Sequence, residues 1–312
     1  MTLEIMIPFY GDPDMLRQTV RSVLAQTSPD WRLTVVDDGY PDPTVAEWFG
    51  ALGDDRVTYT RNEQNLGANK NYEKCIGLAR ERDLVILGAD DLMLPNYVEV
   101  VTAARQAHPG AAVIQPGVEV IDEHGTVVRT LVDETKRRLY QPKVTTRTAM
   151  RGEDLARSLL RGNWLYFPAL CFDVHKIREI GFREGLNVVQ DLALVLDLLM
   201  RGEELVYDPT VCFQYRRHSG SDSSWRALDG TRFAEERRFF LGAAAELETL
   251  GWPRAAQAAR LHTSSRLHAL TYLPAAVRKR RTDAVKTLLD HGFGGLGKEL
   301  GALRSRAGGA AR

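Results

Sequence analysis

The chain has few cysteines, no net charge and no long apolar run, and each absence excludes a class of protein. Its three cysteines, Cys75, Cys171 and Cys212, are isolated and lack metal-ligand spacing, which disfavours a zinc site and indicates a reducing compartment. The 41 basic residues balance 41 acidic residues, so we expect no nucleic-acid partner. No apolar run approaches the ~20 residues of a membrane helix, and no signal peptide precedes the first predicted strand. These features predict a cytoplasmic protein.

Two common phosphate-binding motifs are also missing. No Gly-x-Gly-x-x-Gly follows the first predicted strand, and no loop ends in Gly-Lys-Ser or Gly-Lys-Thr. Dinucleotide-dependent redox enzymes and phosphate-loop ATPases are therefore disfavoured. A nucleotide bound without a glycine cradle needs a metal ion or basic side chains to balance its phosphate charge.

The most informative segment that is present is an acidic pair, Asp90 and Asp91, which follows the apolar run 84–87. Such a run predicts a buried parallel strand, because helices cover both faces of these strands. Ligands bind at the carboxyl ends of strands in open α/β sheets. Two neighbouring carboxylates repel each other unless a cation lies between them, so the pair predicts a divalent cation that carries a diphosphate. A solvated turn at the end of the strand is the alternative.

Strands and helices alternate through the first third of the chain. This rhythm predicts an α/β fold with a parallel, doubly wound sheet, and Asp12 is the expected N-cap of the first helix. The expected strands are 3–7, 33–36, 57–60 and 84–87, and the expected helices are 13–26, 44–52, 69–80 and 95–108.

The pattern changes in the middle of the chain and again near its end. Residues 112–131 predict a hairpin or another antiparallel excursion, and 133–151 predict a mobile loop. Beyond them we expect a helix at 153–160, a strand at 169–173, a helix at 191–200 and a strand at 211–215. From residue 231 the pattern predicts three helices and, from 292, a weakly ordered tail. The expected domains are 1–228, with halves 1–110 and 111–228, and a helical region 229–312.

Five short motifs occur in a recognisable order along the first part of the chain. They are Ile7-Pro8-Phe9-Tyr10, Val23-Leu24-Ala25-Gln26-Thr27, Val36-Asp37-Asp38-Gly39, Asn65-Leu66-Gly67 and Ala89-Asp90-Asp91. In this order and spacing they resemble family-2 glycosyltransferases of the GT-A fold, and the similarity continues more loosely to Ser224. The resemblance implies a Rossmann-like, mostly parallel sheet flanked by helices, to which this chain adds a helical C-terminal extension.

The resemblance also implies a nucleotide-sugar donor, usually a UDP-sugar. Pro8 and Tyr10 would line the pocket for the base and ribose, and Asp37 would accept a hydrogen bond from the base. Lys70 stands where the family usually has Arg and would reach the base or the phosphates. Asp90 would touch the ribose or the sugar.

A metal site for Mg²⁺ or Mn²⁺ follows from the same resemblance. Asp91 would hold the metal through the diphosphate. His218 stands where relatives often carry His or Arg near the diphosphate, so it is a second candidate ligand, although a lone His is as often a surface or core residue. Gly88 departs from the family, which often has Asp there.

Asp191 is the candidate catalytic base, because Gln190-Asp191 resembles the Glu-Asp pair that opens a helix in the family. Inversion requires a carboxylate on the acceptor side to take the proton of the attacking hydroxyl. An ordinary N-cap is the alternative, and a helix N-terminus would weaken the carboxylate as a base. Gln190 replaces the family's Glu.

Four further residues lie close to the predicted site in the sequence. Trp164 and Tyr166 are candidates for stacking on an acceptor sugar, with core packing as the alternative. Arg216 and Arg217, together with 219–224, would suit a lid that closes over phosphates.

The sequence therefore predicts a metal-dependent inverting glycosyltransferase that acts in cell-surface polysaccharide or natural-product glycoside synthesis. A non-catalytic sugar-nucleotide-binding protein is the alternative, and a nucleotidyltransferase is disfavoured because no Gly-rich basic loop follows the first strand. The expected acceptor is a sugar, a lipid-linked sugar or a small molecule. The basic run 278–281 predicts a solvated helix face, with peripheral contact to an acidic membrane as the alternative. The C-terminal helices are candidates for a homodimer contact.

Overall fold

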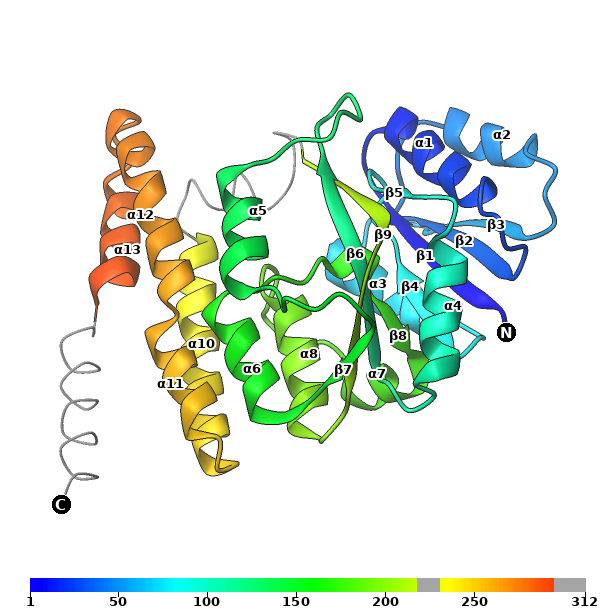
Figure 1. The fold of residues 1–312 in the computed structure, drawn as a ribbon. Helices are drawn as coiled ribbons and strands as arrows, with labels where there is room; N and C mark the ends of the chain where they lie inside the picture. The colour runs from blue at the N-terminus through cyan, green and yellow to red at the C-terminus, as the bar shows by residue number, and fades with distance from the viewer. Residues whose placement is uncertain (218–230, 295–312) are drawn as a thin grey trace, which may run out of the picture.

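The computed structural model, which describes residues 1–217 and 231–294, has one mixed sheet with helices on both faces and a layer of helices at one end (Figure 1). The strand order is β3-β2-β1-β4-β8-β6-β9-β5, and β7 pairs with β9. The strands are β1 (Leu3–Phe9), β2 (Trp31–Asp37), β3 (Val57–Arg61), β4 (Asp83–Ile86), β5 (Leu92–Met93), β6 (Val113–Ile121), β7 (Thr148–Met150), β8 (Cys171–Asp173) and β9 (Leu205–Arg216).

Helices cover the two faces of this sheet. Those of the sheet region are α1 (Pro13–Leu24), α2 (Thr44–Gly50), α3 (Ala68–Leu78), α4 (Tyr97–Ala107), α5 (Leu131–Thr135), α6 (Gly152–Arg161), α7 (Val174–Ile180) and α8 (Gln190–Met200). Two apolar clusters fill the space between the sheet and its two helical layers. The predicted α/β class is therefore confirmed.

The parallel part of the sheet follows the prediction closely. β1 pairs in parallel with β2 and β4, and β2 pairs in parallel with β3. Asp12 caps α1, as expected, because its Oδ1 accepts hydrogen bonds from the backbone N–H groups of Asp14 at 2.7 Å and Met15 at 3.2 Å. Beyond β4 the sheet is mixed, since β8 is antiparallel to both β4 and β6.

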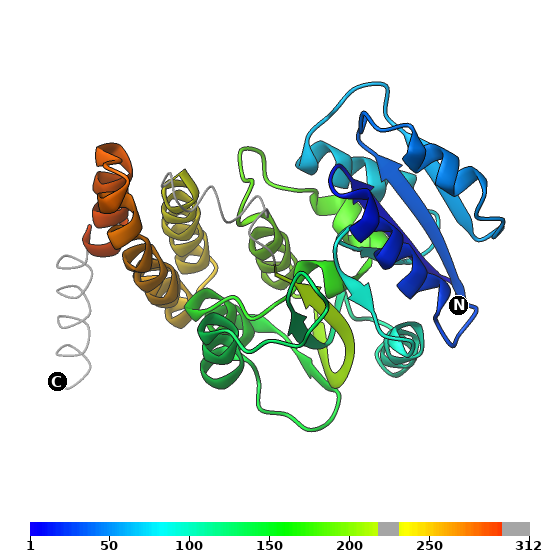
Figure 2. The ribbon, with the colours of Figure 1, turned by 90° about the horizontal axis from the view of Figure 1, so that it is seen from above.

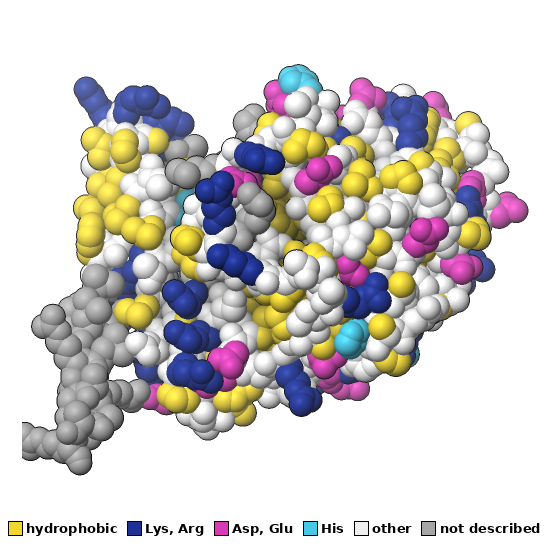
Figure 3. Space-filling model, in the orientation of Figure 1, with side chains coloured by type: hydrophobic (Ala, Val, Ile, Leu, Met, Phe, Trp, Pro, Cys, Tyr) yellow, Lys and Arg dark blue, Asp and Glu magenta, His cyan; other side chains and the backbone are white. Residues whose placement is uncertain are grey.

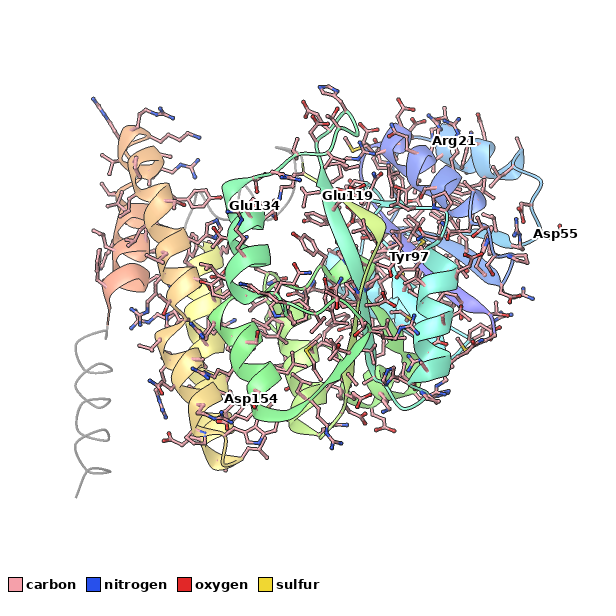
Figure 4. All side chains as sticks on the ribbon, in the orientation of Figure 1. Arg21, Asp55, Tyr97, Glu119, Glu134 and Asp154 are labelled. Atoms are coloured by element: carbon pink, nitrogen blue, oxygen red, sulfur yellow. The ribbon has the colours of Figure 1, made fainter. Side chains whose placement is uncertain are left out.

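Tyr97 shows how α4 is fixed to the sheet. Its ring is fully buried beside β9, where it lies 5.9 Å from the ring of Phe213 (Figure 4). Its hydroxyl donates a hydrogen bond of 2.9 Å to the carbonyl of Ala169. A buried phenol therefore has a partner, as its burial requires.

Of the two predictions for the middle of the chain, one is confirmed in part and the other is wrong. Residues 112–131 do contain antiparallel pairing, because β6 is antiparallel to β8, Ile121 bridges Val127 and the backbone N–H of Val128 donates to the carbonyl of Val120 at 2.8 Å. They do not form a long two-stranded hairpin, because β6 also pairs in parallel with the distant β9. The segment 133–151 is not an irregular loop, because it contains the end of α5, a π-helical turn (Lys136–Tyr140) and β7. The polar sequence of 133–151 has no periodic apolar face, so its pattern did not predict these elements. Contacts with distant segments stabilise them instead.

The C-terminal region contains four described helices instead of the predicted three. They are α10 (Thr231–Thr249), α11 (Pro253–Leu261), α12 (Thr263–Arg278) and α13 (Thr282–Phe293). His262, at φ 28°, interrupts the helix expected over 255–270, and Pro274 lies inside α12 instead of before a new helix. Figure 2 shows these helices as a layer beyond the sheet. Residues 292 and 293 of the predicted tail belong to α13, contrary to the prediction, and the rest of it beyond 294 lies outside the described residues. The predicted boundary at 228 also lies outside them, so the domain division stays a prediction.

The basic run 278–281 lies at the turn between α12 and α13. All four side chains are exposed, which agrees with the expected solvated surface. Lys and Arg side chains gather at this tip in Figure 3. Within 1–217 and 231–294, no helix combines the length and the apolar character needed to cross a membrane.

Candidate functional site

The carboxyl ends of β1 and β2 bring two of the sequence motifs together. The parallel register pairs Phe9 with Asp37, and the backbone N–H of Asp38 donates a 2.8 Å hydrogen bond to the carbonyl of Phe9. Tyr10 lies just beyond and is 58% exposed, with its ring 5.6 Å from that of Tyr40 in an edge-to-face arrangement. An exposed aromatic ring at this edge can stack on a base.

Asp37 is completely buried at the end of β2. Its Oδ1 accepts a 2.7 Å hydrogen bond from the backbone N–H of Tyr40, and its Oδ2 accepts one from the hydroxyl of Tyr59. Burial, followed by this bond to Asp37, raises the pKa of Tyr59. A carboxylate has about four acceptor positions, so Asp37 keeps capacity for a further donor such as the NH of a base.

Asp38 organises the loop ahead of α3, a role that the sequence did not reveal. Its Oδ1 accepts hydrogen bonds from Asn62 Nδ2 at 2.7 Å and from the backbone N–H of Leu66 at 2.8 Å. Its Oδ2 accepts the backbone N–H of Gly67 at 2.9 Å. This buried aspartate thus fixes the Asn65-Leu66-Gly67 motif and the start of α3, where Lys70 is exposed. The only hint in the sequence was the co-occurrence of the two motifs.

The acidic pair lies between β4 and β5 and faces the end of β9. Asp90 is half-buried and Asp91 is 1% exposed. Oxygens of both carboxylates converge over Gly88: a Cβ built there would lie 2.5 Å from Asp91 Oδ2 and 3.0 Å from Asp90 Oδ1. The missing side chain at position 88 therefore leaves room for two carboxylates to approach one point.

The environment of Asp91 disfavours an uncompensated negative charge. Burial, then the charge of Asp90, raises the pKa of Asp91, and the hydrogen bond from the backbone N–H of Arg216 opposes this shift. That bond, to Oδ1, measures 2.7 Å. Within the described ranges, no hydrogen-bond donor reaches Asp91 Oδ2.

These two carboxylates fit a divalent cation shared with a diphosphate. In the described part of the chain, no group of three or more His, Cys, Asp or Glu side chains could form a complete metal cage. Mg²⁺ is usually held by one or two carboxylates and completes its shell with waters and substrate phosphates. Hard carboxylate oxygens that converge over Gly88 match this mode of binding.

Arg216 and Arg217 are not arranged as a lid, contrary to the prediction. The guanidinium of Arg216 is buried and donates to the carbonyls of Asp90 at 2.7 Å and Glu123 at 3.0 Å. Arg217 forms a two-pronged pair with Asp133, with N–O distances of 2.8 and 2.6 Å. The side chain of Arg216 therefore holds the backbone of the acidic pair, and that of Arg217 is held by Asp133. His218 and 219–224 lie outside the described residues.

Asp191 is the second residue of α8 and is half-buried. The N-cap position belongs to Val189, so the alternative role of Asp191 as an N-cap is wrong. Asn163 Nδ2 donates a 3.3 Å hydrogen bond to Asp191 Oδ2, and Asn163 Oδ1 accepts the backbone N–H of Leu165 at 3.1 Å. Asn163 therefore orients the carboxylate of Asp191, and the backbone N–H of Leu165 holds Asn163 in place.

The two aromatic candidates differ in how deeply they are buried. Trp164 is 1% exposed, packs edge-on against Tyr207 and donates to Ser158 Oγ at 3.2 Å, so it belongs to the core. Tyr166 is half-buried, and its hydroxyl donates to Asp133 at 3.1 Å.

Gln190 is buried, and among the described residues its Oε1 has no hydrogen-bond partner.

Comparison with known proteins identifies the family. Residues 4–160 of the 312 match the family model "Glycosyl transferase family 2". The chain is therefore a member of glycosyl transferase family 2, with the GT-A fold that its motifs imply.

Relatives and solved structures extend this assignment. The uncharacterized protein y4gI of Sinorhizobium fredii is 30% identical over 75% of this chain and 23% of its own length. The succinoglycan biosynthesis protein ExoO of Rhizobium meliloti is 26% identical over 70% of this chain and 62% of its own length. This chain thus spans under two thirds of both relatives.

The fold is also similar to that of S. aureus TarS. The crystal structure of TarS 1–349 in complex with UDP-GlcNAc aligns with a TM-score of 0.59 at 12% identity, and covers 94% of this chain and 90% of that one. A second TarS 1–349 structure, in complex with UDP, gives a TM-score of 0.56 at 13% identity. At this identity the likeness concerns the fold.

Proposed function

We propose that this glycosyltransferase moves a sugar from a nucleoside-diphosphate donor, a UDP-sugar, to an acceptor hydroxyl with inversion and with the help of Mg²⁺ or Mn²⁺. The observation that carries the proposal is the convergence of Asp90 and Asp91 over Gly88 at the carboxyl end of β4. Family membership and the UDP complexes of a protein with the same fold support a sugar nucleotide as the ligand of this edge.

In this proposal the ends of β1, β2 and β4 form the donor site. Pro8 and the exposed ring of Tyr10 line the base and ribose pocket, and Asp37 accepts a hydrogen bond from the base. Lys70 reaches the base or the phosphates, and Asp90 contacts the ribose or the sugar. Their positions at one edge of the parallel sheet support these roles.

Asp91 would hold the metal, which supplies positive charge to the departing diphosphate. His218, outside the described residues, stays a candidate ligand. Asp191 would accept the proton of the acceptor hydroxyl as its oxygen bonds to the anomeric carbon and the bond from that carbon to the diphosphate breaks. Its fixed orientation by Asn163 supports this role.

The acceptor and the cellular setting belong to the same proposal. ExoO is named for succinoglycan biosynthesis, which favours assembly of a cell-surface polysaccharide over glycosylation of a natural product. We propose a cytoplasmic enzyme that meets a lipid-linked acceptor through peripheral contacts, for which the exposed basic tip at 278–281 is one candidate surface. The C-terminal helices are a candidate dimer contact.

Titration of UDP, GDP, ADP and dTDP into the protein, with Mn²⁺ and with EDTA, tests the donor site. We expect Mn²⁺-dependent binding of UDP, followed by release of UDP from a UDP-sugar. Failure to bind any of the four nucleotides under either condition would refute the proposal.

A non-catalytic sugar-nucleotide-binding protein is the second candidate, because Gly88 and Gln190 both depart from the family pattern. The two candidates differ in what Asp191→Asn does. An enzyme loses turnover and keeps its donor affinity, whereas a binding protein has no turnover to lose.

A further inference from the structure

The loop that leads into α8 is held by the C-terminal region of the chain. Glu235, on α10, accepts hydrogen bonds through a single oxygen, Oε1, from three successive backbone N–H groups: Asn187 at 2.8 Å, Val188 at 2.6 Å and Val189 at 3.2 Å. Successive N–H groups that converge on one point form a nest for an anionic oxygen. These bonds are charge-assisted, so they exceed ordinary backbone bonds in strength.

The sequence of α8 explains why this contact matters locally. The N-cap, Val189, has no side-chain acceptor to satisfy N–H groups at the start of the helix. Glu235 supplies an acceptor from another part of the chain, although it binds the residues just before the first turn. Asp191 lies two residues beyond the last of these bonds.

Two further contacts hold the same loop. Arg238, one turn along α10 from Glu235, donates a 2.7 Å hydrogen bond to the carbonyl of Gly185. On the other side, Asn69 Nδ2 donates to the carbonyl of Leu186 at 2.6 Å and to Asn187 Oδ1 at 3.2 Å. Asn69 precedes Lys70 in α3. The loop 185–189 is thus fixed between the donor half of the sheet and the C-terminal helices.

We propose that Glu235 is a positioning residue for Asp191: it sets the entry of α8 and so the place of the carboxylate that takes the acceptor proton. This inference rests on the proposed function, because it assigns Asp191 the role of base. It gives the C-terminal helical region a catalytic purpose that no motif of the chain encodes. A misplacement of about 1 Å in a catalytic group can cost about 100-fold in rate.

The test compares Glu235→Ala, Glu235→Gln and Glu235→Asp in the full chain, with UDP release from a UDP-sugar in Mn²⁺ as the readout. We expect Glu235→Ala to lower kcat by about 10- to 100-fold with the donor KM within about twofold of wild type. Glu235→Gln keeps an oxygen at the same reach, so it should restore most of kcat. Glu235→Asp is one methylene shorter and should behave like Ala. Glu248→Ala, on the same helix but paired with Arg260, is the matched control and should leave kcat unchanged.

Hydrogen exchange provides a readout that does not require turnover. The amides of 187–189 should exchange faster in Glu235→Ala than in wild type, and the Gln variant should restore their protection. Unchanged exchange, or a kcat of Glu235→Ala within twofold of wild type, overturns the inference. A different pair of results refutes the proposed function instead. In that case the wild-type protein binds no nucleotide and releases no UDP, while the amides of 187–189 still exchange faster in Glu235→Ala. Glu235 then has a purely structural contact.

Discussion

The sheet region and the terminal bundle, defined here as α10, α12 and α13, have cores of different chemistry. Two large apolar clusters fill both faces of the sheet, and one of them continues into α10 through Phe239, Phe240 and Leu247. The cluster that joins the terminal helices has five buried apolar residues, among them Phe233 and Leu288. Beside it lie buried polar residues, which are Glu236, His262, Ser265, Arg266 and His291.

These polar residues form a connected network in the terminal bundle. Ser265 Oγ donates to Glu236 Oε2 and lies 2.7 Å from His291 Nε2. Burial, more than any neighbouring charge, lowers the pKa of His262 and of His291 to about 4. Among the described residues, one ring nitrogen of each histidine has no partner. The comparison teaches that apolar contacts dominate the core of the sheet region, whereas the smaller core of the bundle also contains two histidines that stay neutral.

The largest expected effect concerns the chemistry of the sheet region. Asp191→Asn should lower kcat for UDP release by about 10³-fold, because an amide cannot take the acceptor proton. Donor affinity, measured by titration with UDP and Mn²⁺, should stay within about twofold. Glu248→Gln in the terminal bundle is the control and should keep wild-type kcat. Wild-type turnover in Asp191→Asn would remove Asp191 from the mechanism.

Acid should loosen the bundle before it loosens the sheet. The unfolded chain binds more protons than the folded one between the ordinary histidine pKa of 6.5 and the folded value of about 4. The histidine contribution is therefore complete above pH 6.5 and is lost as the pH falls toward 4, at a cost of roughly 3 kcal/mol per histidine. Hydrogen exchange at pH 7 and pH 5, corrected for intrinsic rates, should show lost protection in 262–266 and 285–291 but not in β1–β4.

His262→Phe is the matched variant for this prediction. The imidazole stacks on Phe240 at 5.2 Å with the planes 11° apart, so a phenyl ring can occupy the same position. The variant should reduce the pH dependence of protection in the bundle by about half. Equal loss of protection in both regions at pH 5 would contradict the assignment to the buried histidines.

A smaller effect on nucleotide affinity is expected at Gly88, where the carboxylates of Asp90 and Asp91 lie close together. Gly88→Ala places a Cβ 2.5 Å from Asp91 Oδ2, so the carboxylates must move apart. We expect Mn²⁺-dependent UDP affinity to fall about tenfold, or about 1.4 kcal/mol, with little change in metal-free binding. Gly77→Ala, where nothing lies within 4 Å of the added Cβ, is the control. Unchanged affinity in Gly88→Ala would show that Asp90 and Asp91 do not share a cation.

The smallest effect should appear at the junction between the two regions. Arg183 bonds to Glu246 of α10 at 2.9 and 2.6 Å and also to Asp197 of α8. The Glu246 side chain is 44% exposed and that of Asp197 is 14% exposed. Glu246→Gln should therefore cost less than about 1 kcal/mol, and less than Asp197→Asn. Thermal unfolding at low and high salt compares the two, and a larger loss for Glu246→Gln would contradict this ranking.

Local sequence patterns predicted the first third of the chain well and, further along, the elements α6, β8, α8 and part of β9, but they were only partly right at 112–131 and failed at 133–151. The strand at 3–7 and the helix from Pro13 carry their own signals, an apolar run and an Asp12 cap, so they could be placed without tertiary information. The segment around Asp133 carries no such signal. Apart from the local contact with Thr130, Asp133 is held by Tyr166 and Arg217, which lie 33 and 84 residues away.

The candidate site divides in the same way. The sequence predicted Asp90 and Asp91 as site residues from their place at a strand end, and Asp191 from the family resemblance of Gln190-Asp191. It did not identify Asp38 as the anchor of a loop, nor Glu235 as the partner of three backbone N–H groups. Both residues act on backbone that lies distant in sequence, and no local spacing records such contacts.

The sequence by itself determined the α/β class, the parallel direction of the first strands and the acidic pair at the tip of β4. Those features follow from periodicity and from neighbours along the chain. Only the tertiary structure decided that β6 pairs with β9, that the backbone N–H of Arg216 donates to Asp91, and that α10 holds the entry to α8. The physical reason is that burial and hydrogen bonding between distant segments fix these arrangements, and such contacts exist only once the chain has folded.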